Sequence, residues 1–384
     1  MQLGSSQERA PLWTPGFFSI NLIHLLMGMS VYALLPLWPI LMQQSALYDK
    51  VECAIVISIF AVGLYLPCGF CNYWLDTYKR TTVCQTSIIV YMVTLLLCIV
   101  EMPLWALLGI RLLQGVSYGV FQVALGSTIM IDVTDTTQRT RAAHVYYWFG
   151  RFALALGPAI GLWAVSTYSI YGFPWLVLAM VMPALLLLWM LHVPFRMPLE
   201  PKLLSTDRFW MKHGVWLFVC LFLFSLSAGA LLVPMSGLIM YACVAVGFLL
   251  ALLLHVMFLG KADIRWGICI GIFALIFAAV IGLYSHNGVQ MIIYSVLFGL
   301  GVAIITSRFL LSMIRVAQHC QRGTAQSTYM LGWESGLVAG YAAAYMLNDY
   351  NNYYCYLLSI ALLLTAGAMY MFRVYAWYIK NKCR

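Results

Sequence analysis

Long runs of apolar residues dominate the pattern of the chain, and short polar clusters separate them at fairly regular intervals. In the first half these runs cover residues 17–41, 53–75, 83–100, 104–131, 142–165 and 174–193. In the second half they cover residues 215–233, 236–259, 266–284, 289–313, 325–347 and 353–375. Each run suits one spanning helix, because a helix needs about 20 mostly apolar residues to cross a bilayer. The pattern predicts an all-α integral membrane protein with twelve transmembrane helices.

Composition agrees with a bilayer location. Of the 384 residues, 64% are hydrophobic and 9% are charged, whereas about 25% are charged in a soluble domain. Twelve helices leave no room for a soluble catalytic domain, so we expect no enzyme and no catalytic residues. The 11 cysteines are scattered, mostly within the runs, and we predict no disulfide, no metal site and no cofactor.

Basic residues fall in alternate connections, which predicts the orientation because cytoplasmic loops carry the excess of Lys and Arg. The predicted cytoplasmic side receives Lys79, Arg80, Arg139, Arg141, Arg196, Lys202, Arg208, Lys212, Lys261, Arg265, Arg315, Arg322 and the tail 380–384. The opposite side receives only Lys50. We expect both termini in the cytoplasm, a short N-terminal stub without a secretory signal, and a location in the inner membrane of the cell. The net charge of +9 then reflects topology, and we expect no nucleic-acid partner.

The longest polar connection, residues 194–212, divides the helices into six and six. We therefore expect an N-terminal half at 1–193, a cytoplasmic linker at 194–212 and a C-terminal half at 213–384. Residues 139–157 and 322–340 both open with a basic residue and become glycine-rich, a faint internal repeat. Two sets of six helices are the layout of secondary transporters built from repeats, whose halves enclose a cavity near the midplane.

The fourth run contains the segment Leu-Leu-Gly-Ile-Arg-Leu-Leu-Gln-Gly at residues 107–115, which includes Arg111, Gln114 and Gly115. This segment is similar to the L-x-x-x-R-x-x-Q-G motif of the major facilitator superfamily, and all four fixed positions match. The resemblance covers essentially the whole chain and implies that family's fold, two six-helix halves around a central cavity. In that family the arginine is implicated in proton transfer or charge balance, which implies such a role for Arg111.

The fifth run resembles a second motif of the same family, G-x-x-x-G-P-x-x-G-G, found chiefly in exporters. Gly157, Pro158 and Gly161 match in register, while Ala153 and Leu162 replace two glycines. The resemblance in motifs is therefore closest to exporters of the drug/proton antiporter type. Small residues recurring at steps of three and four give a smooth face for close helix packing, and the proline is expected to bend that face.

The loop after the second run resembles the family's G-x-x-x-D-R-x-G-R-K motif. Asp76 and Arg80 match it, while Asn72 and Lys79 stand where the motif has glycine. In the family the aspartate pairs with basic residues and a helix N-terminus and locks the outward-facing state. The resemblance implies that Asp76 and Arg80 form a conformational latch.

Four ionisable residues lie inside the runs, where such groups usually face the interior of the bundle. They are Arg111, Arg151, Arg308 and Glu334. Arg308 is near the basic end of its run, so we expect its head group to snorkel to the interface. Arg151 and Glu334 lie near mid-depth in corresponding helices of the two halves, and either a shared cavity or a mutual ion pair fits their positions. His24, midway along the first run, fits a proton relay or a neutral core residue.

These features favour a secondary active transporter that works by alternating access and exports a small amphipathic compound. Protons are the expected coupling ion, Glu334 a candidate proton carrier, and a monomer the expected state. One alternative is uptake of an organic anion or another small solute by the same fold, with Arg111 and Arg151 as the ligands of an anion. Alternatives of another class are an integral membrane transferase and a non-transporting receptor. Asp132 and Asp135 alone cluster near one membrane face, where a salt-bridged or solvated turn explains them.

Overall fold

The computed structural model describes residues 11–45, 48–98, 100, 102–168, 172–193, 202–260, 262–285, 287–318, 321–348 and 352–382, and its regular structure there is entirely helical. Residues 1–10 of the expected N-terminal stub, residues 194–201 of the expected linker and Lys261 lie outside the described residues, as does the end of the basic tail.

The helices of the first half follow the six apolar runs. They are α1 (Pro15–Ser45), α2 (Lys50–Tyr65), η1 (Leu66–Gly69), α3 (Cys71–Thr77), α4 (Arg80–Leu97), α5 (Leu104–Ala124), η2 (Leu125–Ile129), α6 (Met130–Val133), α7 (Arg139–Thr167) and α8 (Phe173–Met190). The π-helix η2 joins α5 to α6, so one helical path runs through all three elements. Within η2, Ser127 and Thr128 donate side-chain hydrogen bonds to carbonyls four residues earlier.

The helices of the second half repeat this arrangement. They are η4 (Lys212–Gly214), α9 (Val215–Leu232), α10 (Leu238–Leu254), η5 (His255–Leu259), α11 (Ile264–Leu283), α12 (Gly288–Val316), α13 (Arg322–Leu347), α14 (Tyr353–Met369), η7 (Tyr370–Val374) and α15 (Tyr375–Asn381). The π-helices η5 and η7 continue α10 and α14 without a break.

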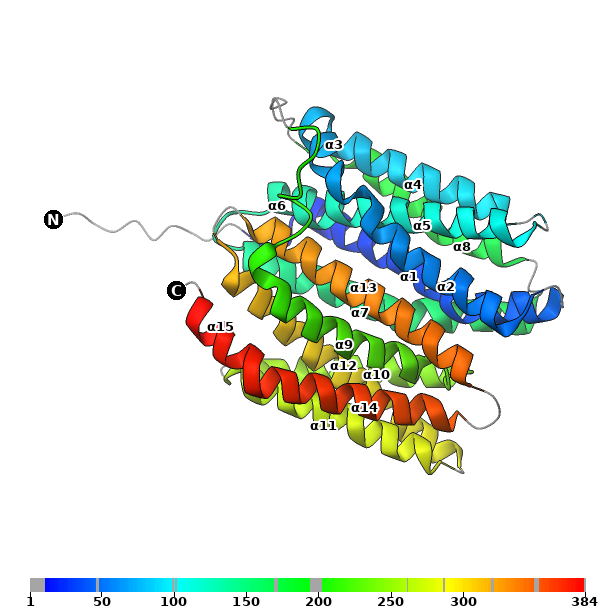
Figure 1. Cartoon of the computed structure of the whole chain (residues 1–384). Coiled ribbons are helices and arrows are strands. Elements are labelled where there is room, and N and C mark those ends of the chain that lie inside the picture. The colour runs from blue at the N-terminus through cyan, green and yellow to red at the C-terminus, as the bar shows by residue number, and fades with distance from the viewer. Residues whose placement is uncertain are drawn as a thin grey trace.

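Eleven helical stretches in the described part of the chain are long and apolar enough to cross a membrane. The remaining long helix, α13, has 26 residues and includes Arg322 and Glu334. It packs extensively against α9 and also against α2, inside the bundle (Figure 1). A helix enclosed by protein tolerates polar side chains that lipid would not. The predicted all-α architecture of twelve long helices is thus confirmed.

The same helix pairs pack in both halves, in the same order along the chain. In the first half α1 packs against α7 and α8, α2 against α5, and α4 against α5 and α8. In the second half α9 packs against α13 and α14, α10 against α12, and α11 against α12 and α14. The two sets are joined mainly where α2 meets α13 and where α7 meets α10. These two contacts are themselves equivalent under the repeat.

The start of α1 and the end of α15 lie at one end of the bundle (Figure 1). We call it the basic end, because Arg80, Arg139, Lys212, Arg315 and Arg322 lie there, at helix starts or ends.

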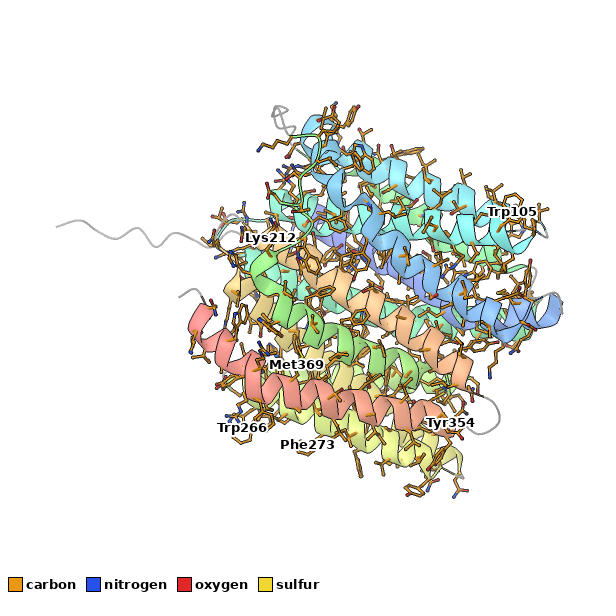
Figure 2. The ribbon with its side chains drawn as sticks, viewed as in Figure 1. Trp105, Lys212, Trp266, Phe273, Tyr354 and Met369 are labelled. Atoms are coloured by element: carbon orange, nitrogen blue, oxygen red, sulfur yellow. The ribbon has the colours of Figure 1, made fainter. Side chains whose placement is uncertain are left out.

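Exposed aromatic side chains lie at both ends of the bundle. Trp266 is exposed near the basic end, while Trp105 and Tyr354 are exposed near the opposite end (Figure 2). Phe273 is exposed between these levels. Tryptophan and tyrosine prefer the two membrane interfaces and flank an apolar band. The surface is that of a multi-pass membrane protein.

Close helix contacts inside each half depend on glycine. A Cβ atom at Gly157 of α7 would overlap the backbone carbonyl oxygen of Met29 in α1. A Cβ atom at Gly340 of α13 would likewise overlap the carbonyl oxygen of Leu226 in α9. The equivalent helix pair of the second half therefore also depends on a glycine for its close contact. Gly161 has more room, because its nearest neighbour would be the Cβ atom of Ala33 at 3.4 Å.

We predict that Gly157→Ala lowers the stability of the protein by about 1–3 kcal/mol, because the added methyl overpacks two backbones. Gly109→Ala is the matched control, since a Cβ at that position in α5 meets no atom within 4 Å. Thermal unfolding of both variants in detergent measures the difference. Equal melting temperatures for the two variants would contradict the close α1–α7 contact.

Candidate functional site

Glu334 lies at the centre of the bundle and is bonded to the first half. Its side chain, on α13, is 3% exposed. Its Oε1 atom accepts hydrogen bonds from the hydroxyl of Tyr32 on α1 at 2.7 Å and from that of Tyr118 on α5 at 3.4 Å. The indole Nε1 of Trp333 donates to the same Tyr32 oxygen at 3.2 Å. Every partner of the carboxylate itself therefore comes from the opposite half.

A chain of buried polar groups connects this carboxylate to His24. Gln122 Nε2 donates to the Tyr118 hydroxyl at 2.6 Å and lies 3.4 Å from Nε2 of His24. The other imidazole nitrogen, Nδ1, is 3.0 Å from the carbonyl oxygen of Tyr146. Since a carbonyl only accepts, Nδ1 carries the proton and Nε2 accepts from the amide, which assigns the neutral tautomer. The ring of His24 also stacks on that of Tyr146, with centroids 3.9 Å apart.

Arg151 occupies an equivalent position on α7 and is 4% exposed. Its Nε donates to the hydroxyl of Thr306 on α12, in the opposite half, at 2.7 Å. Its guanidinium lies over the ring of Trp148, 4.6 Å from the centroid, a favourable cation–π geometry. In the described structure neither Nη1 nor Nη2 has a hydrogen-bond partner of good geometry, although the hydroxyl of Tyr329 lies close enough to interact with the guanidinium. Among the described residues, Arg151 and Glu334 form no ion pair with each other, so the mutual-pair alternative does not apply to this conformation.

Two tyrosines lie near both charges. Tyr147 and Tyr329 contact each other edge to face, with centroids 4.9 Å apart. Each interacts electrostatically with both Arg151 and Glu334. The hydroxyl of Tyr147 also donates to the carbonyl of Gln326 at 3.0 Å. The two charges therefore face one aromatic environment where α7 meets α13.

Arg111 is held apart from these groups, within the first half. Its Nε donates to the carbonyl of Val56 at 3.2 Å and its Nη1 to Oε1 of Gln114 at 2.9 Å. The guanidinium lies 5.2 Å and 4.9 Å from the ring centroids of Trp38 and Phe60. Arg111 thus connects α5 to α2 and α1. On the same helix, a Cβ at Gly115 would overlap the carbonyl of Phe60.

The expectation that Arg308 snorkels to the interface is wrong. Its side chain is 2% exposed, and its Nη2 donates to the carbonyl of Leu259 at the end of η5. The last carbonyls of a helix have no partner within that helix, so this arginine satisfies one of them from inside the bundle.

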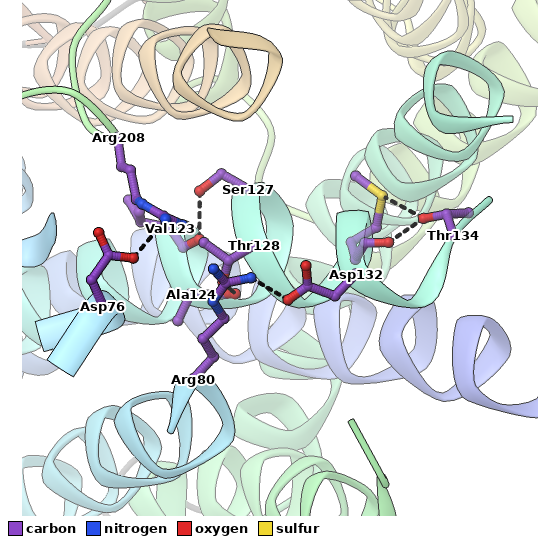
Figure 3. Close-up of polar contacts among 10 residues, drawn as sticks. Asp76, Arg80, Val123, Ala124, Ser127, Thr128, Asp132, Thr134 and Arg208 are labelled. Atoms are coloured by element: carbon purple, nitrogen blue, oxygen red, sulfur yellow. Dashed lines mark hydrogen bonds and ion pairs between the residues drawn. The ribbon is translucent and has the colours of Figure 1, made fainter. Parts of the chain in front are cut away.

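At the basic end, the two residues of the expected latch both form ion pairs. Asp76 in α3 pairs with Arg208 of the linker at 2.5 Å, and Arg80 pairs with Asp132 of α6 (Figure 3). Burial lowers the pKa of the Arg208 guanidinium, and the neighbouring Asp76 carboxylate opposes that shift. Asp135 forms a local turn with the hydroxyl and backbone of Thr137.

These ion pairs border a cavity of about 760 Å³. Asn72, Asp76, Arg80 and Asp132 line it from the first half. Arg208, Lys212 and Thr324 line it from the linker and the second half. The cavity is polar, and it lies where the two halves meet at the basic end.

Several groups at the centre carry no signal in the sequence. Tyr32, Tyr118, Gln122 and Thr306 sit in apolar runs without a motif, yet they are the direct or relayed partners of the two charges. Tyrosine and glutamine occur throughout such runs, so only their three-dimensional position distinguishes these four. The sequence distinguishes Arg208 only by its charge, although this residue is the partner of Asp76.

The family model of the Major Facilitator Superfamily matches residues 20–239, more than half of the 384 residues. The chain therefore belongs to the Major Facilitator Superfamily. Together with the fold, this membership makes it a multi-pass membrane transporter and not an enzyme.

Solved transporter structures share the fold at low sequence identity. A crystal structure of a mutant of the nucleoside transporter NupG has a TM-score of 0.68 and 13% identity, covering 93% of this chain and 99% of that chain. The human organic anion transporter MFSD10 (TETRAN) has a TM-score of 0.67 and 16% identity, covering 93% and 100%. A bacterial homologue of the iron transporter ferroportin, in an outward-facing state, has a TM-score of 0.62 and 16% identity, covering 95% and 99%. No curated protein matches the sequence.

We predict that Asp76 and Arg208 stabilise the protein jointly. Asp76→Asn and Arg208→Gln should each lower the melting temperature, and the double variant should lose less than the sum, with a coupling of about 0.5–1 kcal/mol. Asp135→Asn at the same end is the control carboxylate. A double-mutant cycle of thermal unfolding measures the coupling.

The same Asp76→Asn change should also open the basic end. Half-buried Cys68 in η1 should then react faster with a membrane-impermeant maleimide. Additive stability losses together with an unchanged labelling rate would exclude the latch.

Proposed function

We propose that this protein is a secondary active transporter that exports a small amphipathic compound in exchange for protons. One observation carries the proposal: the carboxylate of Glu334 is buried between the halves, and both of its hydrogen-bond donors belong to the opposite half. Because these hydrogen bonds cross between the halves, a change in the protonation of Glu334 changes the strength of the contact between the halves.

The coupling follows from the strength of these hydrogen bonds. An ionised carboxylate accepts from Tyr32 and Tyr118 about twice as strongly as a neutral acid does. Deprotonated Glu334 therefore holds α13 against α1 and α5, and protonation weakens that contact. Because a ligand shifts a conformational equilibrium only through differential affinity for the two states, the proton acts here as such a ligand.

The polar chain from Glu334 offers a route for the proton. Tyr118 bonds to the carboxylate, and the amide of Gln122 lies between Tyr118 and His24. The amide itself relays no proton, so in this proposal it turns away and lets the basic Nε2 of the neutral imidazole exchange a proton with the Tyr118 hydroxyl. Hydroxyls and imidazoles both give and receive protons. His24 acts in this proposal as the relay between Glu334 and the basic end.

Contacts between the halves at both ends support alternating access. At the end opposite the basic end, Gln43 Nε2 donates to the hydroxyl of Tyr345 at 2.9 Å, and Lys50 donates to the carbonyl of Asn348. Toward the basic end, Tyr147 bonds to Gln326. Glu334 and Arg151 are at most 4% exposed, which supports a conformation in which these two groups are closed off from both ends. Opening one set of contacts while the other persists exposes the centre to one side at a time.

The basic end is cytoplasmic in this proposal, because the excess of Lys and Arg marks the cytoplasmic side. Both termini are then cytoplasmic, and the Asp76 and Arg80 ion pairs work on that side as the latch. The protein acts as a monomer in the inner membrane of the cell.

Uptake of an organic anion is the second candidate. It is favoured by the unbonded Nη1 and Nη2 of Arg151 and by the likeness to an organic anion transporter. Arg111 contributes less to this alternative than Arg151 does, because its guanidinium already bonds to Val56 and Gln114.

We predict that Glu334→Gln abolishes uphill, proton-driven transport while downhill exchange persists at raised substrate concentration, because glutamine mimics the protonated acid. Proteoliposomes loaded with a pH-sensitive dye and challenged with a panel of compounds measure the proton movement. Glu52→Gln, the same change at an exposed cap of α2, is the control. Full uphill transport by a folded Glu334→Gln protein would refute the coupling role.

Arg111→Ala should abolish coupled flux while the protein still inserts into the membrane, because the change removes a buried cation that joins three helices. Arg111→Lys restores the charge but not the geometry of the guanidinium, so it should recover only part of the flux. Flux and thermal stability measured together separate the two contributions. Near-normal flux in Arg111→Ala would remove Arg111 from the mechanism.

A further inference from the structure

Two oppositely charged side chains at the centre of the described structure each have atoms without a hydrogen-bond partner. Glu334 uses Oε1 and leaves Oε2 without a hydrogen-bond partner, while Arg151 uses Nε and leaves Nη1 and Nη2 without one. Both side chains are almost completely buried. Leaving a buried polar atom unpaired costs about 1–3 kcal/mol, and more for a charged group. These atoms therefore favour a ligand that supplies the missing partners.

The two charges bond to different partners and form no ion pair with each other in the described structure. Tyr32 and Tyr118 hold the carboxylate, while Thr306 holds the guanidinium and Tyr329 lies beside it. A cationic ligand would satisfy Glu334 and leave Arg151 unmatched, and an anionic ligand would do the reverse. A ligand that carries both charges satisfies both groups at once.

The surroundings indicate what joins the two ligand charges. Tyr147 and Tyr329, in edge-to-face contact, each interact with both Glu334 and Arg151. Trp333 adjoins the carboxylate through Tyr32, and Trp148 lies under the guanidinium. Aromatic walls of this kind favour a flat apolar body between the two charged ends. Glu334 and Arg151 form no ion pair with each other in the described structure and bond to different partners, so we expect this body to separate the two ligand charges.

We propose that the centre binds an amphoteric aromatic compound, with an amine at one end of a planar apolar body and an acid group at the other. The amine donates to Oε2 of Glu334, and the acid accepts from Nη1 and Nη2 of Arg151 in the bidentate geometry that guanidinium groups favour. This inference rests on the proposed function and names its substrate class. It also gives the exchange a physical basis, because the amine and the proton compete for one carboxylate.

The experiment compares four probes on the full-length protein in detergent. They are 4-(aminomethyl)phenylacetate, which carries both charges at opposite ends; 4-methylphenylacetate, with the acid alone; 4-methylbenzylamine, with the amine alone; and phenylalanine, with both charges at one end. We expect the first probe to bind at least about tenfold more tightly than each of the others, measured by calorimetry and by ligand-dependent shifts in melting temperature.

Variants assign each end of the probe. Glu334→Gln should erase the advantage of the first probe over the acid-only compound, and Arg151→Gln should erase its advantage over the amine-only compound. Glu52→Gln should change neither. If the Glu334 or Arg151 variant fails to fold, the comparison of the four probes on the unsubstituted protein still tests the proposal.

The outcomes separate this inference from the function on which it rests. Equal binding of the amine-only or the acid-only compound, or binding of none of the four probes by the folded protein, overturns the substrate class. Proton movement in proteoliposomes driven by the amine-only compound, without preference for the first probe, overturns the class and leaves the transporter intact. Tight binding of the first probe without any proton movement contradicts proton-coupled transport and supports the site.

Discussion

The structure depends on how charges are accommodated at the depth of a bilayer. An ionised group there costs at least about 2.5 kcal/mol on insertion scales, so each intramembrane charge needs partners inside the protein. Arg111 finds carbonyl, amide and aromatic partners within its own half, and Arg308 finds the carbonyl of Leu259. Glu334 and Arg151 instead bond to hydroxyls of the opposite half. The hydrogen bonds that stabilise these two buried charges are therefore also part of the contact between the halves.

This division of partners fits a molecule in which two rigid bodies move against each other. Within each half, backbones touch at glycine, as Gly157 and Gly340 illustrate, and such contacts do not tolerate sliding. Between the halves, by contrast, the bonds around Glu334 and Arg151 are hydroxyl contacts, which a ligand or a proton can replace. Energy differences of a few kcal/mol at these groups are then enough to shift the balance between arrangements.

The repeat in the architecture gives the site its two opposite charges. Helices α7 and α13 occupy equivalent positions in the two halves, since each packs against the first long helix of its half. Arg151 and Glu334 thus occupy related helices, and their helices pack against the neighbouring half. At the basic end the symmetry is broken, because Asp76 uses Arg208 of the linker, a segment that occurs once in the chain.

The sequence by itself determined the helix count and the family, because hydrophobic length and motif spacing are local properties. Even α13, with its buried glutamate, was recognisable from the length of its run. Only the tertiary structure decided the partners, since Tyr32 and Glu334 are separated by 302 residues and no local pattern links them. The burial of Arg308 was mispredicted for the same reason: the carbonyl that it satisfies belongs to the end of another helix, η5. Hydrogen bonds between distant segments are set by packing geometry, which composition and periodicity do not encode.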